Sequence, residues 1–388
     1  MQSNQPQQTA MLPLSGCRVL ERSNTVAAAY AGRMLAVMGA RVVMLEPPGG
    51  SRLRHAPPLI DQSGDSALFS YLAVGKRSLE ADLATAPGRA LLARDLDDAD
   101  ILIDDTPVRQ RTALGLSPHE ISRHWPDLVH VSVLPFGATG PKADWDGEEI
   151  NLLHAGGEGY LLPNGLSHEL FPDRPPLKIY GHFAGYQGGA MAALCALSAW
   201  WAVPSGGGQY VDVSVQDSVL SVGAFALQRL GDGSLEHRAS RRFRYGGVFQ
   251  AQDGYIELLT LEDRQWASLV ELLGRPAWAA DPGLRDPLER SRRGDEINSH
   301  IRAWMARYAV DDIVRRAQEL GVPAAKYRLP AEVIDGEQER ARGLFAPAVL
   351  ASGLEADILV APFQFRSTPL PRAGAVPALN EMAQEVTA

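Results

Sequence analysis

Two adjacent carboxylates, Glu148 and Glu149, precede a glycine-rich stretch and are the leading candidates for chemistry in this sequence. The surrounding run reads PFGATGPKADWDGEEINLLHAGGEGY and contains Gly156, Gly157 and Gly159. Glycine lets the backbone approach a ligand closely, so that its N–H groups can face an oxyanion. We interpret Glu149 as a catalytic carboxylate and the three glycines as a candidate oxyanion loop.

The same acids also have a structural interpretation. Acidic side chains favour the first turn of a helix because they complement its positive end. Glu148 and Glu149 would then open a helix that runs into Ile150–Leu153. The residues alone leave both interpretations open.

Basic side chains that could bind phosphate occur at two places. Arg52 and Arg54 lie in the loop Glu46–Arg54, directly after a strand-like run, where open α/β sheets bind ligands. Lys76 and Arg77 follow later in the segment GKRSLEADL. Each pair could contact a phosphate, and each could equally be a solvated surface pair.

The elements that must position these residues alternate between strand and helix. The runs CRVLE, SNTVAAAYAGRMLAVMGA and RVVMLE predict a βαβ unit, and the pattern repeats to about residue 230. Glycines at 185, 188 and 189 predict close packing of a helix that spans His182–Val203. We expect a disordered lead-in at 1–12, a large α/β domain at 13–230, a small α+β domain at 231–327, and a return segment or tail at 328–388.

Composition narrows the function. The 388 residues are 45% hydrophobic, which is typical of a globular protein. Their net charge of −9 argues against nucleic-acid binding.

The two cysteines form no metal-binding spacing, so we expect reduced thiols, a cytoplasmic protein and no metal. No apolar run is long enough to predict a membrane span, and we expect no membrane partner. The turn after CRVLE lacks GxGxxG, and no GxxxxGKS or GxxxxGKT run occurs, so dinucleotide and Walker-type sites lack their motifs.

Taken together, many short motifs resemble the family III CoA transferases, also called the CaiB/BaiF type, a superfamily that includes the α-methylacyl-CoA racemases. The resemblance covers about 14–343, and no single motif carries it. The matching runs, in chain order, are GCRVLE, AGRMLAVMGARVVMLEPPGG, GKRSLEADL, ADILI, LGLSP, PFGATGP, GGGQYVDVSVQDSV, DGYIELLTLEDRQW, LLGRP and ELGVPAAK.

The resemblance implies a reaction, a fold and an assembly. It implies a Rossmann-like large domain, an interlocked homodimer, and transfer of CoA from an acyl-CoA to a carboxylic acid. Coenzyme A is then a substrate, and no tightly bound cofactor is expected. Its nucleotide is expected near Arg54, Lys76 and Arg77. Aligned from the PFGATGP turn, the family's aspartate corresponds to Glu149, one methylene longer.

Two other functions remain open at this point. A racemase would exchange the proton α to the thioester, with Glu262 in LTLEDRQW, or Glu148, as a second acid or base beside Glu149. A catalytically degenerate homologue would bind CoA without turnover. In its favour, the Asn-Phe-Arg-Pro-Gly loop typical of the family is replaced at 105–109, and an Asn-Arg pair is replaced by Ala73 and Val74.

Overall fold

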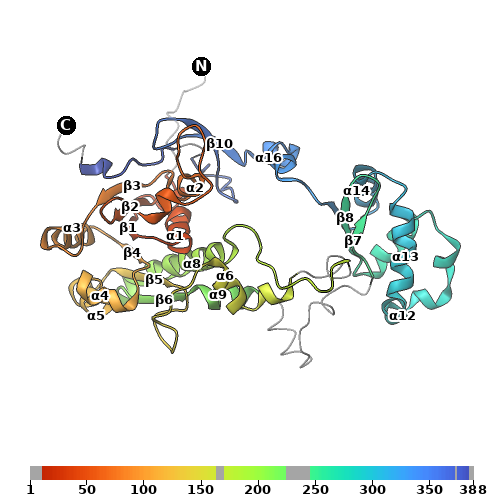
Figure 1. Cartoon of the computed structure of the whole chain (residues 1–388), viewed down its shortest axis with the longest axis horizontal. Helices are drawn as coiled ribbons and strands as arrows, with labels where there is room; N and C mark the ends of the chain where they lie inside the picture. Colours follow the sequence, from red (N-terminus) through yellow and green to blue (C-terminus); the bar gives the residue numbers. More distant parts are fainter. Residues whose placement is uncertain (1–10, 163–169, 224–244, 372–373, 384–388) are drawn as a thin grey trace, which may run out of the picture. The chain divides into compact units, whose positions relative to one another are not determined.

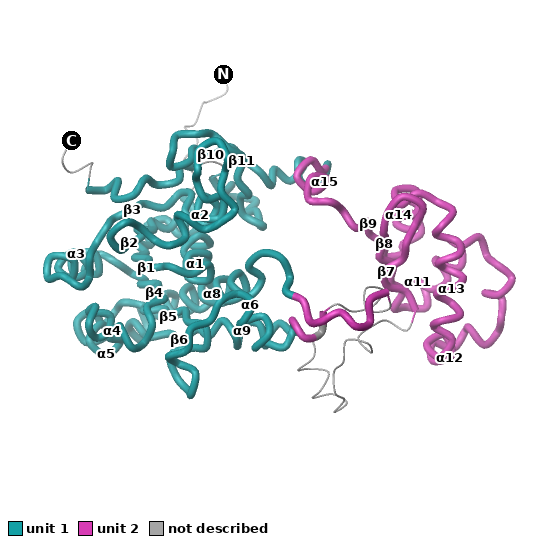
Figure 2. The backbone as a smooth tube through the Cα atoms, viewed as in Figure 1, with its two compact units in different colours: residues 1–158, 178–226, 337–388 teal, residues 159–177, 227–336 magenta. Residues whose placement is uncertain are grey.

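The computed structural model describes residues 11–162, 170–223, 245–371 and 374–383 (Figure 1). The chain divides into two compact units, shown in Figure 2. Unit 1 comprises Met1–Glu158, Lys178–Ala226 and Glu337–Ala388, and unit 2 comprises Gly159–Leu177 and Leu227–Gly336. Residues 1–10 of the expected lead-in lie outside the described residues. The chain passes from unit 2 back to unit 1 after residue 336, whereas the sequence analysis placed the end of the small domain at 327.

Unit 1 contains a six-stranded parallel sheet in the order β3-β2-β1-β4-β5-β6. The chain leaves β1 toward β2 and β3 and then returns to the other side of β1 with β4. The strand order therefore reverses beside β1, and such a reversal opens a crevice at the carboxyl ends of the strands. The strands are β1 (Arg18–Arg22), β2 (Arg41–Glu46), β3 (Arg77–Glu80), β4 (Ile101–Asp104), β5 (Val129–Leu134) and β6 (Tyr210–Ser214).

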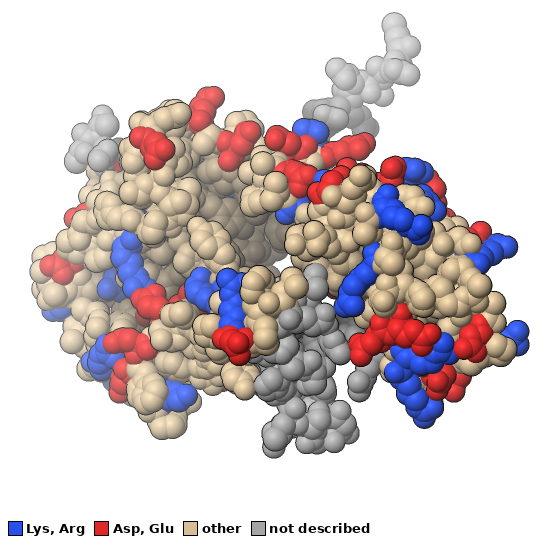
Figure 3. Space-filling view, turned by 45° about the vertical axis from the view of Figure 1, so that its right-hand side comes forward, with Lys and Arg blue, Asp and Glu red and all other residues tan. Residues whose placement is uncertain are grey.

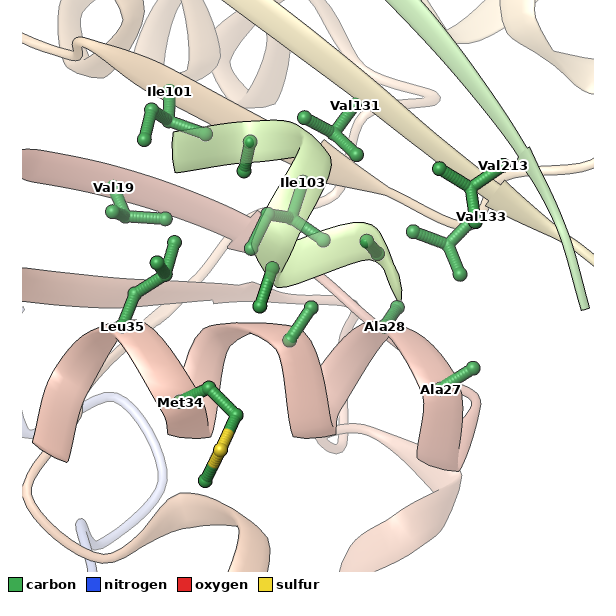
Figure 4. Close-up of a cluster of buried hydrophobic side chains, with 14 of the residues drawn as sticks. Val19, Ala27, Ala28, Met34, Leu35, Ile101, Ile103, Val131, Val133 and Val213 are labelled. Atoms are coloured by element: carbon green, nitrogen blue, oxygen red, sulfur yellow. The ribbon is translucent and has the colours of Figure 1, made fainter. Parts of the chain in front are cut away.

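Both faces of this sheet are covered, which explains why its strands are nearly continuous apolar runs. Alternate residues of one strand point to opposite faces. Val19 and Ile101 join the cluster beneath α1 (Val26–Val37), as Figure 4 shows. Leu20 and Leu102 join a second cluster with residues of α3 (Ala86–Asp97).

Glycine brings α1 and the long helix α8 (Phe183–Gly206) together. A Cβ on Gly189 would stand 2.5 Å from the carbonyl oxygen of Ala27, and one on Gly185 would stand 3.1 Å from the Cβ of Val26. Only glycine therefore permits this approach. The predicted helix at His182–Val203 is present, with slightly different ends.

Short elements complete unit 1, and the last part of the chain returns to it. The antiparallel pair β10 (Phe345–Val349) and β11 (Glu355–Leu359) is followed by residues that bond to the β2–β3 edge, such as Asn380, whose N–H donates to Ser78 Oγ at 3.1 Å. The other short helices of unit 1 are η1 (Arg52–His55), α2 (Ala67–Ala73), α4 (Val108–Leu114), α5 (Pro118–His124), α6 (Glu149–Ala155), α9 (Val215–Val222) and α16 (Glu337–Arg342). The helix η2 (Glu158–Leu161) begins at the boundary with unit 2, and α15 (Pro330–Ile334) belongs to unit 2.

Unit 2 has its own core. A three-stranded antiparallel sheet in the order β7-β8-β9 packs with helices around buried residues such as Phe249, Ile301 and Ile313. The expected fold class, a parallel α/β unit with a smaller α+β unit, is confirmed. The elements of unit 2 are β7 (Gly247–Gln250), β8 (Tyr255–Leu258), α11 (Asp263–Leu272), η3 (Ala277–Ala280), η4 (Pro282–Arg285), α12 (Pro287–Arg292), α13 (Gly294–Met305), α14 (Val310–Glu319) and β9 (Ala324–Lys326).

Candidate active site

A cavity of about 270 Å³ lies in unit 1, bordered by segments that follow the carboxyl ends of β1, β2, β5 and β6. This is the edge at which an open parallel sheet binds ligands. The walls are mostly apolar, and four titratable side chains reach them. The lining residues are Thr25, Val26, Ala27, Arg52, Leu53, Ala56, Leu68, Val133, Pro135, Gly147, Glu148, Glu149, Leu152, His182, Gly185 and Val215.

The carboxylate of Glu149 is bound to the N-terminus of α8. Its Oε1 accepts a hydrogen bond from the N–H of Ala184 at 2.8 Å, and its Oε2 accepts one from the N–H of Gly185 at 3.0 Å. The residue at the N-cap position, His182, makes no capping bond with its side chain. Glu149 therefore takes over the capping role, and the positive end of α8 stabilises its negative charge.

Glu148 has a different partner. Its Oε1 accepts a hydrogen bond from Nη1 of Arg52 at 2.9 Å, and both side chains are more than half exposed. It is also the N-cap of α6, and its N–H donates to Oδ1 of Asn151 at 3.0 Å. Glu148 and Glu149 therefore do start a helix, α6, as the structural interpretation expected, but the side chain of Glu149 caps a different helix, α8.

The glycines expected to form an oxyanion loop have other functions. The N–H of Gly156 donates to the carbonyl of Leu152, and the N–H of Gly157 donates to that of His154. A Cβ on Gly156 would stand 2.5 Å from Val219 Cγ1, so this glycine allows α6 to pack against α9. Gly159 lies in η2 and does not line the cavity. The donors at the cavity are instead the N–H groups of Ala184 and Gly185, so the sequence-based assignment of Gly156 and Gly157 needs correction.

His182 was missed by sequence reasoning. It lines the cavity, and no hydrogen bond to its ring nitrogens is found within the described residues. Burial lowers the pKa of His182, against the opposing effect of the Glu149 carboxylate. The imidazole is therefore neutral at physiological pH and can accept a proton. A histidine that immediately precedes a long small-residue helix was the available signal.

Two of the three residues expected to bind CoA are committed to buried ion pairs. Arg54 donates to both carboxylate oxygens of Glu46, at 2.7 and 2.6 Å, and its side chain is 10% exposed. Lys76 donates to Glu21 Oε2 at 2.6 Å and is fully buried. Lys76 cannot contact a ligand in this structure, so that assignment is wrong on grounds of burial.

The two arginines at the surface differ in position. Arg77 donates to Oε1 of Glu381 at 2.7 Å and is 36% exposed, and it does not line the cavity. Arg52 does line it, anchored by a bond from its Nε to the carbonyl of Asn24 at 2.6 Å. Arg52 is thus the cation that the structure brings beside Glu148 and Glu149.

Glu262, the expected second acid, belongs to unit 2. It is the N-cap of α11, and Oε1 of Gln265 accepts a hydrogen bond from its N–H at 3.1 Å. Its side chain is exposed and lies 3.5 Å from Arg264. Its local role is to start a helix, and it is not among the residues that line the cavity of unit 1.

Figure 3 shows acidic and basic side chains side by side on the visible face, without an extended area of one sign. Among the described residues, no cluster of His, Cys, Asp or Glu could hold a metal ion. None of the described helices is both long and apolar enough to span a bilayer.

Comparison with known proteins finds similar chains among the CoA transferases. The succinate–glutarate CoA-transferase of Agrobacterium fabrum is 28% identical over 97% of this chain and 95% of that protein. The succinyl-CoA–D-citramalate CoA-transferase of Chloroflexus aurantiacus is 27% identical over 83% of this chain and 80% of that protein. A crystal structure of a CaiB/BaiF family protein from Brucella suis superposes with a TM-score of 0.83 at 26% identity, covering 97% of this chain and 99% of that one.

A family model provides the remaining evidence. The model described as CoA-transferase family III matches residues 14–382, which is nearly the whole chain. The resemblance noted from the sequence motifs is thereby confirmed. The chain belongs to CoA-transferase family III.

Proposed function

We propose that this protein transfers CoA from an acyl-CoA to a carboxylic acid, with Glu149 as the residue that carries the acyl group and then CoA. The supporting observation is the carboxylate of Glu149 in a cavity at the ligand-binding edge of the sheet, held by the N-terminus of α8. The alternative of a catalytically degenerate homologue draws its support from the replaced motif residues at 73–74 and 105–109, and the geometry of this cavity does not add to it.

The proposed reaction needs no net proton transfer. The Glu149 carboxylate attacks the thioester carbonyl, CoA thiolate leaves, and a mixed anhydride forms. The thiolate then attacks the glutamyl carbonyl of the anhydride, which releases the donor acid and leaves a glutamyl-CoA thioester. An acceptor carboxylate attacks that thioester, which expels CoA thiolate and forms a second mixed anhydride. The thiolate then attacks the acceptor's acyl carbon, and the Glu149 carboxylate leaves. Covalent catalysis conserves the thioester bond energy throughout.

The capping bonds supply the electrostatic part of this mechanism. When the thiolate attacks the glutamyl carbonyl, negative charge develops on an Oε atom of Glu149. Each Oε atom of the resting carboxylate already faces one N–H group, that of Ala184 at 2.8 Å for Oε1 and that of Gly185 at 3.0 Å for Oε2, so either oxygen has a donor in place. Donors that are in place before the charge appears are the most effective form of such stabilisation.

The substrates and surroundings follow from this proposal. Acyl-CoA and a carboxylic acid are the partners, and coenzyme A acts as substrate. Arg52 is the cation best placed for the phosphates or the thiolate because it lines the cavity, and like Arg54 and Arg77 it would have to leave a carboxylate partner, here Glu148. We also propose a homodimer and a cytoplasmic location, which analytical ultracentrifugation and cell fractionation can test.

A direct test is to trap the covalent intermediate. The protein is incubated with an acyl-CoA, treated with hydroxylamine, and mapped by peptide mass spectrometry. We expect the modification on Glu149, with Glu148 unmodified. An adduct on His182 instead would transfer the covalent role to that residue.

The matching variant is Glu149→Gln. We expect its rate of transfer to fall at least about 1,000-fold, because the amide cannot form the anhydride. Glu120→Gln, an exposed acid in the first turn of α5, is the control and keeps full activity. CoA binding without any Glu149-dependent turnover would favour the degenerate homologue.

One observation favours a second candidate, exchange of the proton α to the thioester. His182 is a neutral base in the same cavity as Glu148, so two groups that could exchange protons are present. The test is deuterium uptake from D₂O into a 2-methylacyl-CoA with no acceptor acid present. Uptake that is lost in His182→Gln would establish this activity, and absence of uptake would exclude it.

A further inference from the structure

A second, larger cavity of about 890 Å³ adjoins the first, also within unit 1. Ala56, Leu68 and His182 line both cavities, so a ligand that reaches Glu149 can extend past His182 into the second space. The volume lies in the range of small-molecule sites. Its lining residues are Tyr30, Ala56, Pro57, Pro58, Ile60, Ala67, Leu68, Ser70, Tyr71, Lys178, Tyr180, Gly181, His182, Tyr186, Leu350, Ala356, Asp357, Ile358 and Leu359.

Three tyrosines form the aromatic wall of this space, which we call the tyrosine cavity. Tyr30 and Tyr186 pack edge to face with ring centroids 4.8 Å apart, and Tyr71 lies 6.3 Å from each. Burial raises the pKa of Tyr186 to about 12, so its hydroxyl stays neutral at physiological pH. Aromatic rings in such edge-to-face sets readily accept one more ring.

The charged side chains among the described lining residues of the tyrosine cavity are Lys178 and Asp357, and the Asp357 carboxylate would repel a second carboxylate. Lys178 donates to the carbonyls of Ile179 and Gly181, at 3.0 and 2.8 Å. Arg33 stands 5.7 Å from the Tyr71 ring, but it is buried and donates to the carbonyls of Val74 and Leu359. No arginine is among the described residues that line the cavity. A distal carboxylate would therefore be desolvated without the bidentate partner that such groups favour.

We propose, on the basis of the transferase function above, that the acid carried by this enzyme is a bulky apolar monocarboxylate, aryl or aryl-alkyl, whose hydrocarbon part occupies the tyrosine cavity. Its carboxyl or thioester carbon lies at Glu149. This preference differs from that of the similar transferases described above, whose names give dicarboxylic or hydroxy-dicarboxylic acids.

The first test compares acceptors for the wild-type chain. With acetyl-CoA as donor, 3-phenylpropanoate and glutarate are supplied separately, and the new thioesters are quantified by liquid chromatography and mass spectrometry. We expect kcat/KM for 3-phenylpropanoate to be at least about tenfold higher, as apolar contacts of this size allow. A preference for glutarate overturns the inference and leaves the transferase function intact.

A second test changes the cavity itself. Ile60 is a half-buried residue of the lining. Ile60→Arg is expected to move selectivity toward glutarate by about tenfold or more, because it supplies the missing cation. Ile60→Met, which stays apolar and similar in volume, is the matched control. Unchanged selectivity in a folded Ile60→Arg protein counts against the proposal.

Two further measurements keep the idea testable if that variant is unstable or turnover is absent. Ala67→Phe fills the cavity and should reduce use of 3-phenylpropanoate by a larger factor than use of acetate. Calorimetry on the wild type should also give tighter binding of phenylpropanoyl-CoA than of glutaryl-CoA. Absence of transfer to any acid would defeat the transferase proposal, whereas equal affinities for the two thioesters would defeat only the inference about the tyrosine cavity.

Discussion

At the scale of single residues, the buried ion pairs show how easily basic side chains are misassigned. Lys76 and Arg54 follow loops and look like phosphate contacts in the sequence, yet each has a carboxylate partner inside the fold. The signal was in the strands, because Glu21 and Glu46 are acids within apolar runs. A buried acid requires a cationic or hydrogen-bonding partner.

The Glu21–Lys76 pair leads to a stability prediction. Lys76→Met should lower the free energy of unfolding by about 3–5 kcal/mol, because Glu21 is left buried without its cation. Combining it with Glu21→Leu should recover much of that loss. Urea denaturation of the wild type, both single variants and the double variant measures the coupling. Additive losses in the double variant would show that the pair does not act as a unit.

Glu149 and His182 differ in how far the sequence could reveal them. Glu149 lies in a motif-rich run, so its chemistry was predictable. Its hydrogen bonds to Ala184 and Gly185 were not, since they depend on how α6 packs beside α8. His182 carries no local motif, and only the tertiary fold brings it to the cavity.

At the scale of elements, the contact between α1 and α8 depends on glycine. Gly189→Ala would place a Cβ 2.5 Å from the carbonyl oxygen of Ala27, which belongs to the backbone and cannot rotate away. The overpacking exceeds the gain in helix propensity, so we expect a net loss of about 1–2 kcal/mol in unfolding free energy.

The control for this experiment is in the same helix. A Cβ on Gly206 would meet no atom within 4 Å, so Gly206→Ala should leave stability unchanged or slightly higher. Chemical denaturation of the two variants compares them directly. Equal stabilities would mean that the helices can separate without cost.

The start of α1 gives a pH-dependent prediction. Oδ2 of Asp105 accepts hydrogen bonds from the N–H groups of Asn24 and Thr25, both at 2.7 Å. Burial nevertheless raises the pKa of Asp105 from 3.8 to about 6. The folded state therefore holds this proton more tightly than the unfolded state, and the resulting stabilisation is present below pH 3.8 and lost as the pH rises through about 6.

Asp105→Asn removes that titration. Relative to the wild type, the variant should gain about 2–3 kcal/mol of unfolding free energy between pH 4 and pH 7, because it has no charge to bury. Denaturation curves of both proteins at several pH values give the difference. A difference that stays constant with pH would contradict the raised pKa.

At the scale of the whole molecule, the class of each unit was accessible from the sequence, while the order of the strands in the sheet was not. Apolar runs separated by helical periods predict a parallel sheet without any knowledge of contacts. The limits of the units were harder to place, because residues 159–177 lie far in the sequence from the rest of unit 2 and yet group with it. Long-range grouping of this kind is set by packing.

Two separate cores imply that damage to one unit stays local. Ile301 is fully buried in unit 2, and Ile103 is fully buried in the sheet of unit 1. Replacing either by alanine should cost about 2–5 kcal/mol in its own unit. Hydrogen exchange should show faster exchange in the substituted unit only. Acceleration throughout the chain in both variants would indicate a single cooperative unit.

The bond between Glu149 and α8 has a consequence for evolution. The same carboxylate anchors a 24-residue helix and is proposed to perform the chemistry, so selection acts on it for two reasons at once. A glutamine keeps one acceptor oxygen for the two N–H groups and loses reactivity, while a carboxylate on a shorter arm keeps the reactive group but changes its reach to the helix. Substitution of Glu149 would therefore affect both the reaction and the capping of α8, and the capping would still matter in a descendant that no longer needs catalysis.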